Sequence, residues 1–174
     1  MSEAGRITIR PATRADAALV LAFIRELAVY ERLEDEVAAT VTDIEAALFA
    51  PRPYAEVVFA CLEAVPVGFA LFFHNFSTFL GKPGIYLEDL FVRPEARGLG
   101  IGRRLLAWLA QTTLERGGAR LDWAVLDWNE PSIGFYRSLG AVALDEWSTF
   151  RMSGAALQKL ARGSPPRRPK QGGL

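Results

Sequence analysis

The stretch that decides the fold is YLEDLFVRPEARGLGIGRRLLAWL, residues 86–109. It begins with bulky apolar residues around two adjacent carboxylates, Glu88 and Asp89, and this composition predicts a strand. Glycines then occupy alternate positions from Gly98 to Gly102, directly before a strongly helical segment. Because such glycines leave backbone N–H groups unobstructed at the positive end of a helix dipole, the stretch predicts a site for a phosphate group.

Two standard phosphate loops do not match this glycine spacing. A P-loop requires Gly-Lys-Ser/Thr at its end, whereas Gly102 is followed by Arg103. A dinucleotide fingerprint requires Gly-x-Gly-x-x-Gly, whereas every gap here is one residue, although Asp122 lies about twenty residues further on. A helix start with flexible glycines and no ligand is the structural alternative. The arginines on both sides, Arg97 before and Arg103 and Arg104 after, can donate hydrogen bonds to phosphate oxygens.

The composition predicts a single folded domain in a reducing compartment. The chain has 174 residues, of which 51% are hydrophobic, and this excludes a disordered chain. It contains no run of about 18 apolar residues that would predict a membrane span, and its first residues lack the apolar core of a secretion signal. The single cysteine, Cys61, cannot form an internal disulfide, which indicates a cytoplasmic location. The single histidine, His74, has no partner of the kind that a zinc site needs, so we expect no metal.

The charges are balanced overall but unevenly distributed. The chain has 20 basic and 20 acidic residues, and three of the basic ones lie in residues 163–174, which leaves 17 basic against 20 acidic residues in 1–162. A mildly acidic domain is a poor nucleic-acid binder. The segment 163–174 is rich in proline, glycine and positive charge, and it is predicted to be a disordered tail after a domain that spans 1–162.

Hydrophobic periodicity predicts a mixed α/β or α+β domain. Strand patterns occupy residues 7–10, 56–62, 67–73, 84–92, 120–126, 141–144 and 148–152. Helical patterns extend to about residue 30 after a capping box at 13–16, and they cover 42–49, 101–116, 131–139 and a short segment from 154. The early hairpins favour antiparallel pairing and the later crossovers favour parallel pairing, so we expect a mixed sheet covered by helices.

A second group of polar residues lies in DWNEPSIGFYRSLGA, residues 127–141. Asn129 stands just before a Glu-Pro helix start, where its side chain can cap the helix or reach a ligand. Tyr136 follows later in the same helix, where its ring can also simply pack under the sheet.

Taken together, these segments resemble the GNAT superfamily of N-acetyltransferases. The family signature Arg/Gln-x-x-Gly-x-Gly/Ala stands here as RGLGIG at 97–102. More narrowly, the chain resembles the diamine acetyltransferases, which comprise the spermidine/spermine and thialysine N-acetyltransferases. The shared stretches, in the same order, are IRPAT at 9–13, ELAVYE at 26–31, YLEDLFV at 86–92, RGLGIG at 97–102 and WNEPSIGFY at 128–136. The resemblance implies a mixed, mostly antiparallel central sheet of about six to seven strands flanked by helices.

The resemblance also implies acetyl-CoA as the cosubstrate and a small cationic amine as the acceptor. The implied acetyl-CoA site consists of Leu90, Phe91, Val92, Arg97, Gly98, Leu99, Gly100, Ile101, Gly102, Arg103, Asn129, Glu130, Pro131 and Ser132. The implied acceptor site consists of Tyr30, Glu31, Glu88, Asp89, Asp122, Trp123 and Ala124. The resemblance further implies that the acceptor cleft is completed across a homodimer.

Acetyl transfer to an amine requires a neutral amine, and a lysine-like amine is only about 0.04% neutral at pH 7. Glu88 is the predicted base, because its apolar sequence neighbours are expected to raise its pKa, although its side chain can instead point to solvent. An ideal strand places Asp89 on the face opposite to Glu88, and a local bulge can bring both toward one cleft. Tyr136 is the predicted acid for the departing thiolate, or a group that only orients the thioester sulfur. The N–H of Leu90 is the predicted donor to the oxyanion.

The substrate remains open between several amines. Phe79 stands where the animal polyamine enzymes carry a tryptophan, while Ser77-Thr78 matches the thialysine-type pattern. A protein-acetylating enzyme of the same superfamily, a non-catalytic acetyl-CoA-binding module and, more distantly, a nicotinamide-linked oxidoreductase are the rival functions.

Overall fold

The computed structural model describes residues 7–163, which belong to two compact units, Met1–Leu126 and Asp127–Leu174. The strands of the first unit are β1 (Ile7–Pro11), β2 (Glu56–Leu62), β3 (Val65–Ser77), β4 (Lys82–Val92) and β5 (Leu121–Trp123). Its helices are α1 (Ala17–Glu31), α2 (Val41–Leu48) and α3 (Ile101–Glu115), with the short 3-10 helices η1 (Arg14–Asp16), η2 (Glu34–Glu36) and η3 (Pro94–Ala96). The second unit contains α4 (Glu130–Ser138) and α5 (Gly154–Arg162).

The first unit is built on one mixed sheet with the strand order β1-β2-β3-β4-β5. The first four strands pair antiparallel with their neighbours, and β5 pairs parallel with β4 after the crossover through α3. The predicted mixed, mostly antiparallel sheet is therefore confirmed. The expected six to seven strands are wrong, because the described residues form five.

The two missing strands are those predicted at 141–144 and 148–152, in the second unit. An alternating pattern records which side chains are apolar, but a strand also requires a neighbouring backbone to which it can hydrogen-bond. These segments have no such neighbour among the described residues, and Leu144 and Trp147 instead close a local turn. Their apolar side chains are accordingly exposed, with Val142 84% and Phe150 92% accessible.

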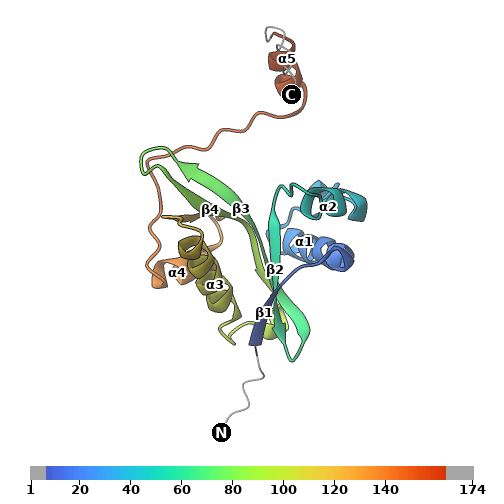
Figure 1. Ribbon diagram of the computed structural model, residues 1–174, viewed down its shortest axis with the longest axis vertical. Coiled ribbons are helices and arrows are strands. Elements are labelled where there is room, and N and C mark those ends of the chain that lie inside the picture. The colour runs from blue at the N-terminus through green and yellow to red at the C-terminus, as the bar shows by residue number, and fades with distance from the viewer. Residues whose placement is uncertain (1–6, 164–174) are drawn as a thin grey trace, which may run out of the picture. The chain divides into compact units, whose positions relative to one another are not determined.

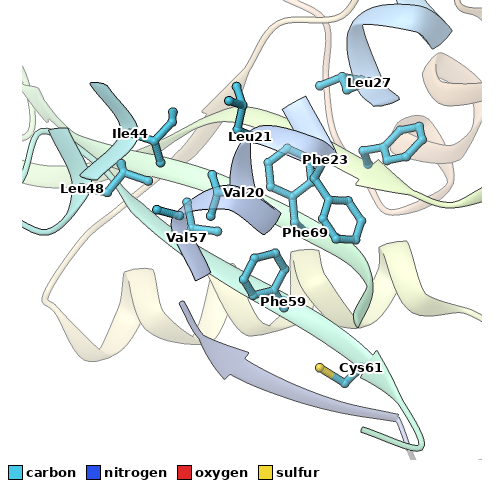
Figure 2. Close-up of a cluster of buried hydrophobic side chains, with 12 residues drawn as sticks. Val20, Leu21, Phe23, Leu27, Ile44, Leu48, Val57, Phe59, Cys61 and Phe69 are labelled. Atoms are coloured by element: carbon cyan, nitrogen blue, oxygen red, sulfur yellow. The ribbon is translucent and has the colours of Figure 1, made fainter. Parts of the chain in front are cut away.

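The principal core lies between α1, α2 and one face of the sheet. Figure 2 shows Phe23 of α1 in the middle of this cluster, beside Phe69 of β3 and Phe59 of β2. The centroid of the Phe23 ring lies 5.6 Å from that of Phe59 and 5.2 Å from that of Phe69, and it lies 6.5 Å from that of Phe91 in β4. The apolar stripe of α1 therefore buries itself against three adjacent strands.

The opposite face of the sheet is covered by α3 (Figure 1). Trp108 of α3 packs edge-on against Phe72 of β3, with ring centroids 5.9 Å apart. Because alternate residues of a strand face opposite sides, Phe69 and Phe72 place β3 in both cores. The first unit is thus a sheet between two helical layers.

One strained turn gives a stability prediction. The two residues between β2 and β3, Glu63 and Ala64, both have left-handed backbones, with φ of 48° and 70°. Two-residue hairpin turns of this kind prefer Asn-Gly, since an alanine there costs about 1–2 kcal/mol. Ala64→Gly is expected to raise the free energy of unfolding by about 0.5–1 kcal/mol after the extra backbone entropy of glycine is subtracted. Urea denaturation measures this change.

The matched control for that turn is Ala110→Gly on the exposed surface of α3. There the same change is expected to lower the free energy of unfolding by about 1 kcal/mol, because the backbone is helical. A loss of stability at both positions would contradict the strain assigned to Ala64.

Candidate active site

The predicted phosphate loop connects β4 to α3 in the first unit. After η3 the chain passes through Gly98 and Gly100, whose φ angles of 80° and 76° lie in the left-handed region. Gly100 is the N-cap of α3, and nothing lies within 4 Å of a Cβ added at either glycine. The glycines are therefore required by backbone conformation and not by crowding. Their amides lie beside the helix N-terminus, which suits an anion.

The arginines around the loop are used in different ways. Arg103 and Arg104 lie exposed in the first turn of α3, and within residues 7–163 their side chains have no hydrogen bond or ion pair. The Nε of Arg97 instead donates to the carbonyl oxygen of Val92 at 2.9 Å. Its guanidinium carbon lies 4.9 Å from the ring centroid of Tyr30 and 5.6 Å from that of Phe91. The first two arginines can thus meet a phosphate, while Arg97 binds the protein itself.

A bulge in β4 determines where the two carboxylates lie. Asp89 is opposite Leu71 of β3 and Leu87 is opposite Phe72, so Glu88 is an extra residue between the two pairs. Leu71 packs on the α1-side core, and cross-strand partners share a face, so Asp89 also lies on the α1 side. The bulge that the sequence left open is present at this point.

The predicted burial of Glu88 is wrong, and the adjacent Asp89 is the carboxylate that is partly buried. Glu88 is exposed, whereas Asp89 is half-buried. The pKa of Asp89 is raised from 3.8 to about 7, chiefly by burial and in smaller part by the negative charges of Glu88 and Glu31. Burial also raises the pKa of Glu31, which ends α1. Two carboxylates from separate elements are therefore close enough to influence Asp89.

The strand β5 is the edge strand that pairs with β4 and carries two of the predicted acceptor residues. Asp122 lies opposite Tyr86 of β4, and one of its oxygens accepts from Nδ2 of Asn75 and pairs with Nε of Arg120, each at 2.8 Å. The carboxylate of Asp122 is thus already held by the protein. Trp123 follows opposite Leu87, and Ala124 lies exposed beyond the strand end.

One residue of this region was missed by sequence reasoning. Tyr86 stacks on Phe73 of β3 with ring centroids 5.2 Å apart. Burial raises the pKa of the Tyr86 hydroxyl, and the charges of Glu88 and Asp122 add to the increase. Its partner Phe73 shares a face with Leu71, so Tyr86 lies on the same face as Asp89. Its position in the YLED motif, next to the two carboxylates, could have indicated a role for Tyr86. Strict alternation along the strand, however, predicts that Tyr86 and Asp89 lie on opposite faces of the sheet.

The second unit carries the remaining predicted residues on α4. Asn129 is only 5% exposed, and its Oδ1 accepts from the backbone N–H of Ser132 at 3.4 Å, which confirms the predicted helix cap. Glu130 and Pro131 form the first turn of α4. Tyr136 lies in the last turn, with its ring centroid 5.4 Å from that of Phe135. The cap fixes the orientation of this helix start within its unit.

Comparison with known proteins decides the family. A family model described as the Acetyltransferase (GNAT) family matches residues 21–141. The chain belongs to the GNAT family of acetyltransferases. GNAT acetyltransferases use acetyl-CoA as their cosubstrate, and the glycine loop that connects β4 to α3 lies within the matched residues.

Curated GNAT relatives cover nearly the whole chain. A thialysine N-epsilon-acetyltransferase of Bos taurus is 37% identical over 166 residues, which cover 89% of this chain and 97% of the relative. An L-ornithine N5-acetyltransferase of Arabidopsis thaliana is 31% identical, over 87% of this chain and 86% of the relative. Among solved structures, an integron cassette protein from the mobile metagenome of V. cholerae superimposes with a TM-score of 0.76 at 28% identity, over 90% of this chain and 98% of that one.

No helix formed by residues 7–163 is both long and apolar enough to cross a membrane. In that same range, His, Cys, Asp and Glu side chains do not gather in threes as a metal site would require.

Proposed function

We propose that this GNAT enzyme transfers an acetyl group from acetyl-CoA to the primary amine of a small cationic acceptor, such as a thialysine-like diamino acid, a diamine or a polyamine. The observation that carries the proposal is the combination, within one unit, of an open amide loop at Gly98–Gly100 with an acidic group around Asp89. The amides suit the pyrophosphate of acetyl-CoA, and the carboxylates suit a protonated amine. The names of the curated relatives, which specify terminal side-chain amines, support the same class.

In the proposed complex, acetyl-CoA lies along the end of β4 and over the start of α3. Its pantetheine arm pairs with the backbone of Leu90–Val92, and its pyrophosphate accepts from the amides between Gly98 and Arg103. The family resemblance alone also assigns acetyl-CoA binding to the residues at the start of α4, after the Asn129 cap. Support for this arrangement comes from the left-handed glycines, which turn the loop, and from the exposed arginines beside them.

The proposed reaction needs one proton acceptor and one proton donor. The carboxylate pair of Glu88 and Asp89 takes a proton from the ammonium group, and the neutral nitrogen then attacks the thioester carbonyl carbon. The N–H of Leu90 donates to the resulting oxyanion. The carbon–sulfur bond breaks, and the hydroxyl of Tyr136 gives its proton to the departing thiolate. The attacking nitrogen then gives its second proton to the Tyr136 phenolate to leave the neutral amide, and the carboxylate pair releases its proton to water. Within the pair, Asp89 has the pKa near neutrality that a base at physiological pH requires.

Some of the proposed acceptor residues bind the charged groups of the amine, and others line the cleft. Glu31 and the Glu88–Asp89 pair attract the positive charges of the amine, while Tyr30 forms a wall of the cleft. Trp123 was also predicted for this site, but it pairs with Leu87 and so lies on the α3 face of the sheet, away from these carboxylates. Asp122 is proposed to act mainly on Asn75 and Arg120, because it already contacts both. The homodimer and the cytoplasmic location also stay predictions, and sedimentation velocity of the full chain tests the first of them.

The function is tested by measuring thiol release from acetyl-CoA with thialysine, lysine, ornithine, spermidine, short diamines and a lysine peptide. We expect turnover with at least one small amine, and a kcat/KM for it at least tenfold above that of the peptide. Preference for the peptide would favour the protein-acetylating alternative. Saturable acetyl-CoA binding without release for any amine would favour a non-catalytic binding module.

A further inference from the structure

Two arginines from the segment after β4 hold successive turns of α1. Arg93 forms a bidentate ion pair with Glu26, with nitrogen–oxygen distances of 2.7 and 2.9 Å, and its guanidinium lies 4.5 Å from the ring centroid of Phe23. Arg97 lies four residues later and stacks on Tyr30, which is four residues after Glu26. The body of α1 is thus fixed by Arg93, and its last turn is contacted by Arg97.

The Arg97 side chain makes one hydrogen bond and lies over two aromatic rings. The Nε–H is used by the carbonyl of Val92, at the end of β4. The guanidinium then lies over Tyr30 and Phe91, whose ring centroids are 6.4 Å apart and whose planes are tilted by 55°. A planar guanidinium suits this position, because it can donate in its plane while its face lies on an aromatic ring.

This contact joins the two halves of the proposed site. Arg97 directly precedes Gly98, the first left-handed residue of the phosphate loop. Tyr30 directly precedes Glu31, whose charge acts on Asp89. The Arg97–Tyr30 stack therefore connects the loop to the end of α1, where the charge of Glu31 acts on Asp89.

We propose that Arg97 is a positioning residue for the acceptor site, which fixes the Tyr30–Glu31 turn to the phosphate loop so that acetyl-CoA and the amine bind synergistically. The inference rests on the proposed function and assigns Arg97 a role other than phosphate binding. A bound pyrophosphate restricts the loop, the restricted loop orders Arg97, and the ordered stack holds Glu31 beside Asp89. Because coupling is reciprocal, the amine must tighten acetyl-CoA binding by the same factor.

The kinetic test compares Arg97→Met with Arg103→Met, a matched loss of one loop arginine. We expect Arg97→Met to raise the KM of the amine about tenfold while the dissociation constant of acetyl-CoA changes less than threefold. Arg103→Met is expected to do the reverse, raising the acetyl-CoA constant and leaving the KM of the amine within a factor of two. If Arg97→Met weakens acetyl-CoA as Arg103→Met does and spares the amine, Arg97 is a phosphate ligand and the positioning role is overturned.

Two further variants separate stacking from charge. Arg97→Lys keeps the charge but loses the planar group, so it is expected to behave like Arg97→Met if stacking matters and like the wild type if charge alone matters. Tyr30→Leu removes the ring and is expected to raise the amine KM, with no additional increase when it is combined with Arg97→Met. Additive effects of the two changes would overturn the coupling between these residues.

Hydrogen exchange supplies a readout that does not depend on turnover. Saturating acetyl-CoA is expected to slow exchange of the amides at 98–102 and also of those at 30–33, which are hydrogen-bonded at the end of α1. In Arg97→Met, protection at 98–102 is expected to remain while protection at 30–33 is lost. Protection of the loop alone in the wild-type chain would overturn the inference. An absence of turnover with every amine would instead count against the proposed function.

Discussion

Replacing Asp89 by asparagine is expected to lower kcat/KM for the amine about 100-fold and to remove the acidic limb of its pH profile. The pKa of Asp89 is raised to about 7, chiefly by burial, so the wild-type rate should increase as the pH rises through 7 and the carboxylate loses its proton. Asparagine is close in shape but cannot accept the ammonium proton. Initial rates at subsaturating amine, from pH 5.5 to 9, measure both effects.

Glu88→Gln is the matched control for Asp89→Asn. The charge of Glu88 contributes to the raised pKa of Asp89, so its removal is expected to move the acidic limb to lower pH without removing it. The opposite pattern, in which Glu88→Gln abolishes the limb and Asp89→Asn retains it, would assign the base to Glu88 and contradict the role of Asp89.

Asp89→Asn should also make the protein more stable than the wild type at high pH. A carboxyl group with a raised pKa in the folded state binds its proton more tightly there than in the unfolded chain, so stability falls as the pH rises from about 4 to about 7. Above pH 7 the wild type carries the full cost, which a shift from 3.8 to about 7 places at up to about 4 kcal/mol. Asp89→Asn is therefore expected to unfold at higher urea than the wild type at pH 8, and at the same urea at pH 3.5.

Tyr136→Phe is expected to lower kcat about 100-fold with an unchanged dissociation constant for acetyl-CoA. The hydroxyl is the proposed proton donor to the thiolate, and loss of such a donor typically costs a factor of 100 to 10,000. The phenyl ring retains the packing against Phe135 in the last turn of α4, so the helix should keep its structure. Rapid-quench turnover and calorimetric titration with acetyl-CoA give the two constants separately.

Phe135→Leu is a useful comparison for Tyr136→Phe, because it disturbs the same ring pair without removing the hydroxyl. It is expected to reduce thermal stability more than kcat. Unchanged turnover in Tyr136→Phe would exclude the donor role, and a parallel loss of acetyl-CoA affinity would indicate that the hydroxyl only orients the thioester.

The sequence predicted the framework of the first unit well, because its elements are determined by local chemistry. The capping box at Thr13–Asp16 forms as expected, and the strand predicted at 56–62 matches β2 at both ends. The glycine turn also lies where the alternate glycines placed it, with two of them in left-handed conformations that other residues seldom adopt. In each case a few neighbouring residues are sufficient to determine the conformation.

The features that the sequence left open or did not predict depend on residues that are far apart in the chain. The bulge at Glu88 exists because β3 and β4 pair in a particular register, and this register decides that burial acts on Asp89. Arg97 was expected on the phosphate, but the aromatic rings that it contacts belong to α1 and β4. The segments at 141–144 and 148–152 have strand-like alternation, yet alternation says nothing about which backbone is available for pairing. The predicted tail at 163–174 lies almost entirely outside the described residues.

The extra residue in β4 also allows the two halves of this strand to face different helices. Leu87 pairs with Phe72 and faces α3, whereas Phe91 pairs with Phe69 and faces α1, although the two residues are four positions apart. In a regular strand both side chains would face the same helix. Deleting Glu88 would remove only this extra residue, because Leu87 would stay opposite Phe72 and Asp89 opposite Leu71 in a regular strand. Both apolar sets would keep their cores, and the acid and the bulge would be lost. An evolving or engineered version of this protein can therefore omit Glu88 without reversing the strand, whereas a further residue inserted between Leu87 and Phe91 would have to enlarge the bulge or turn one half of the strand over.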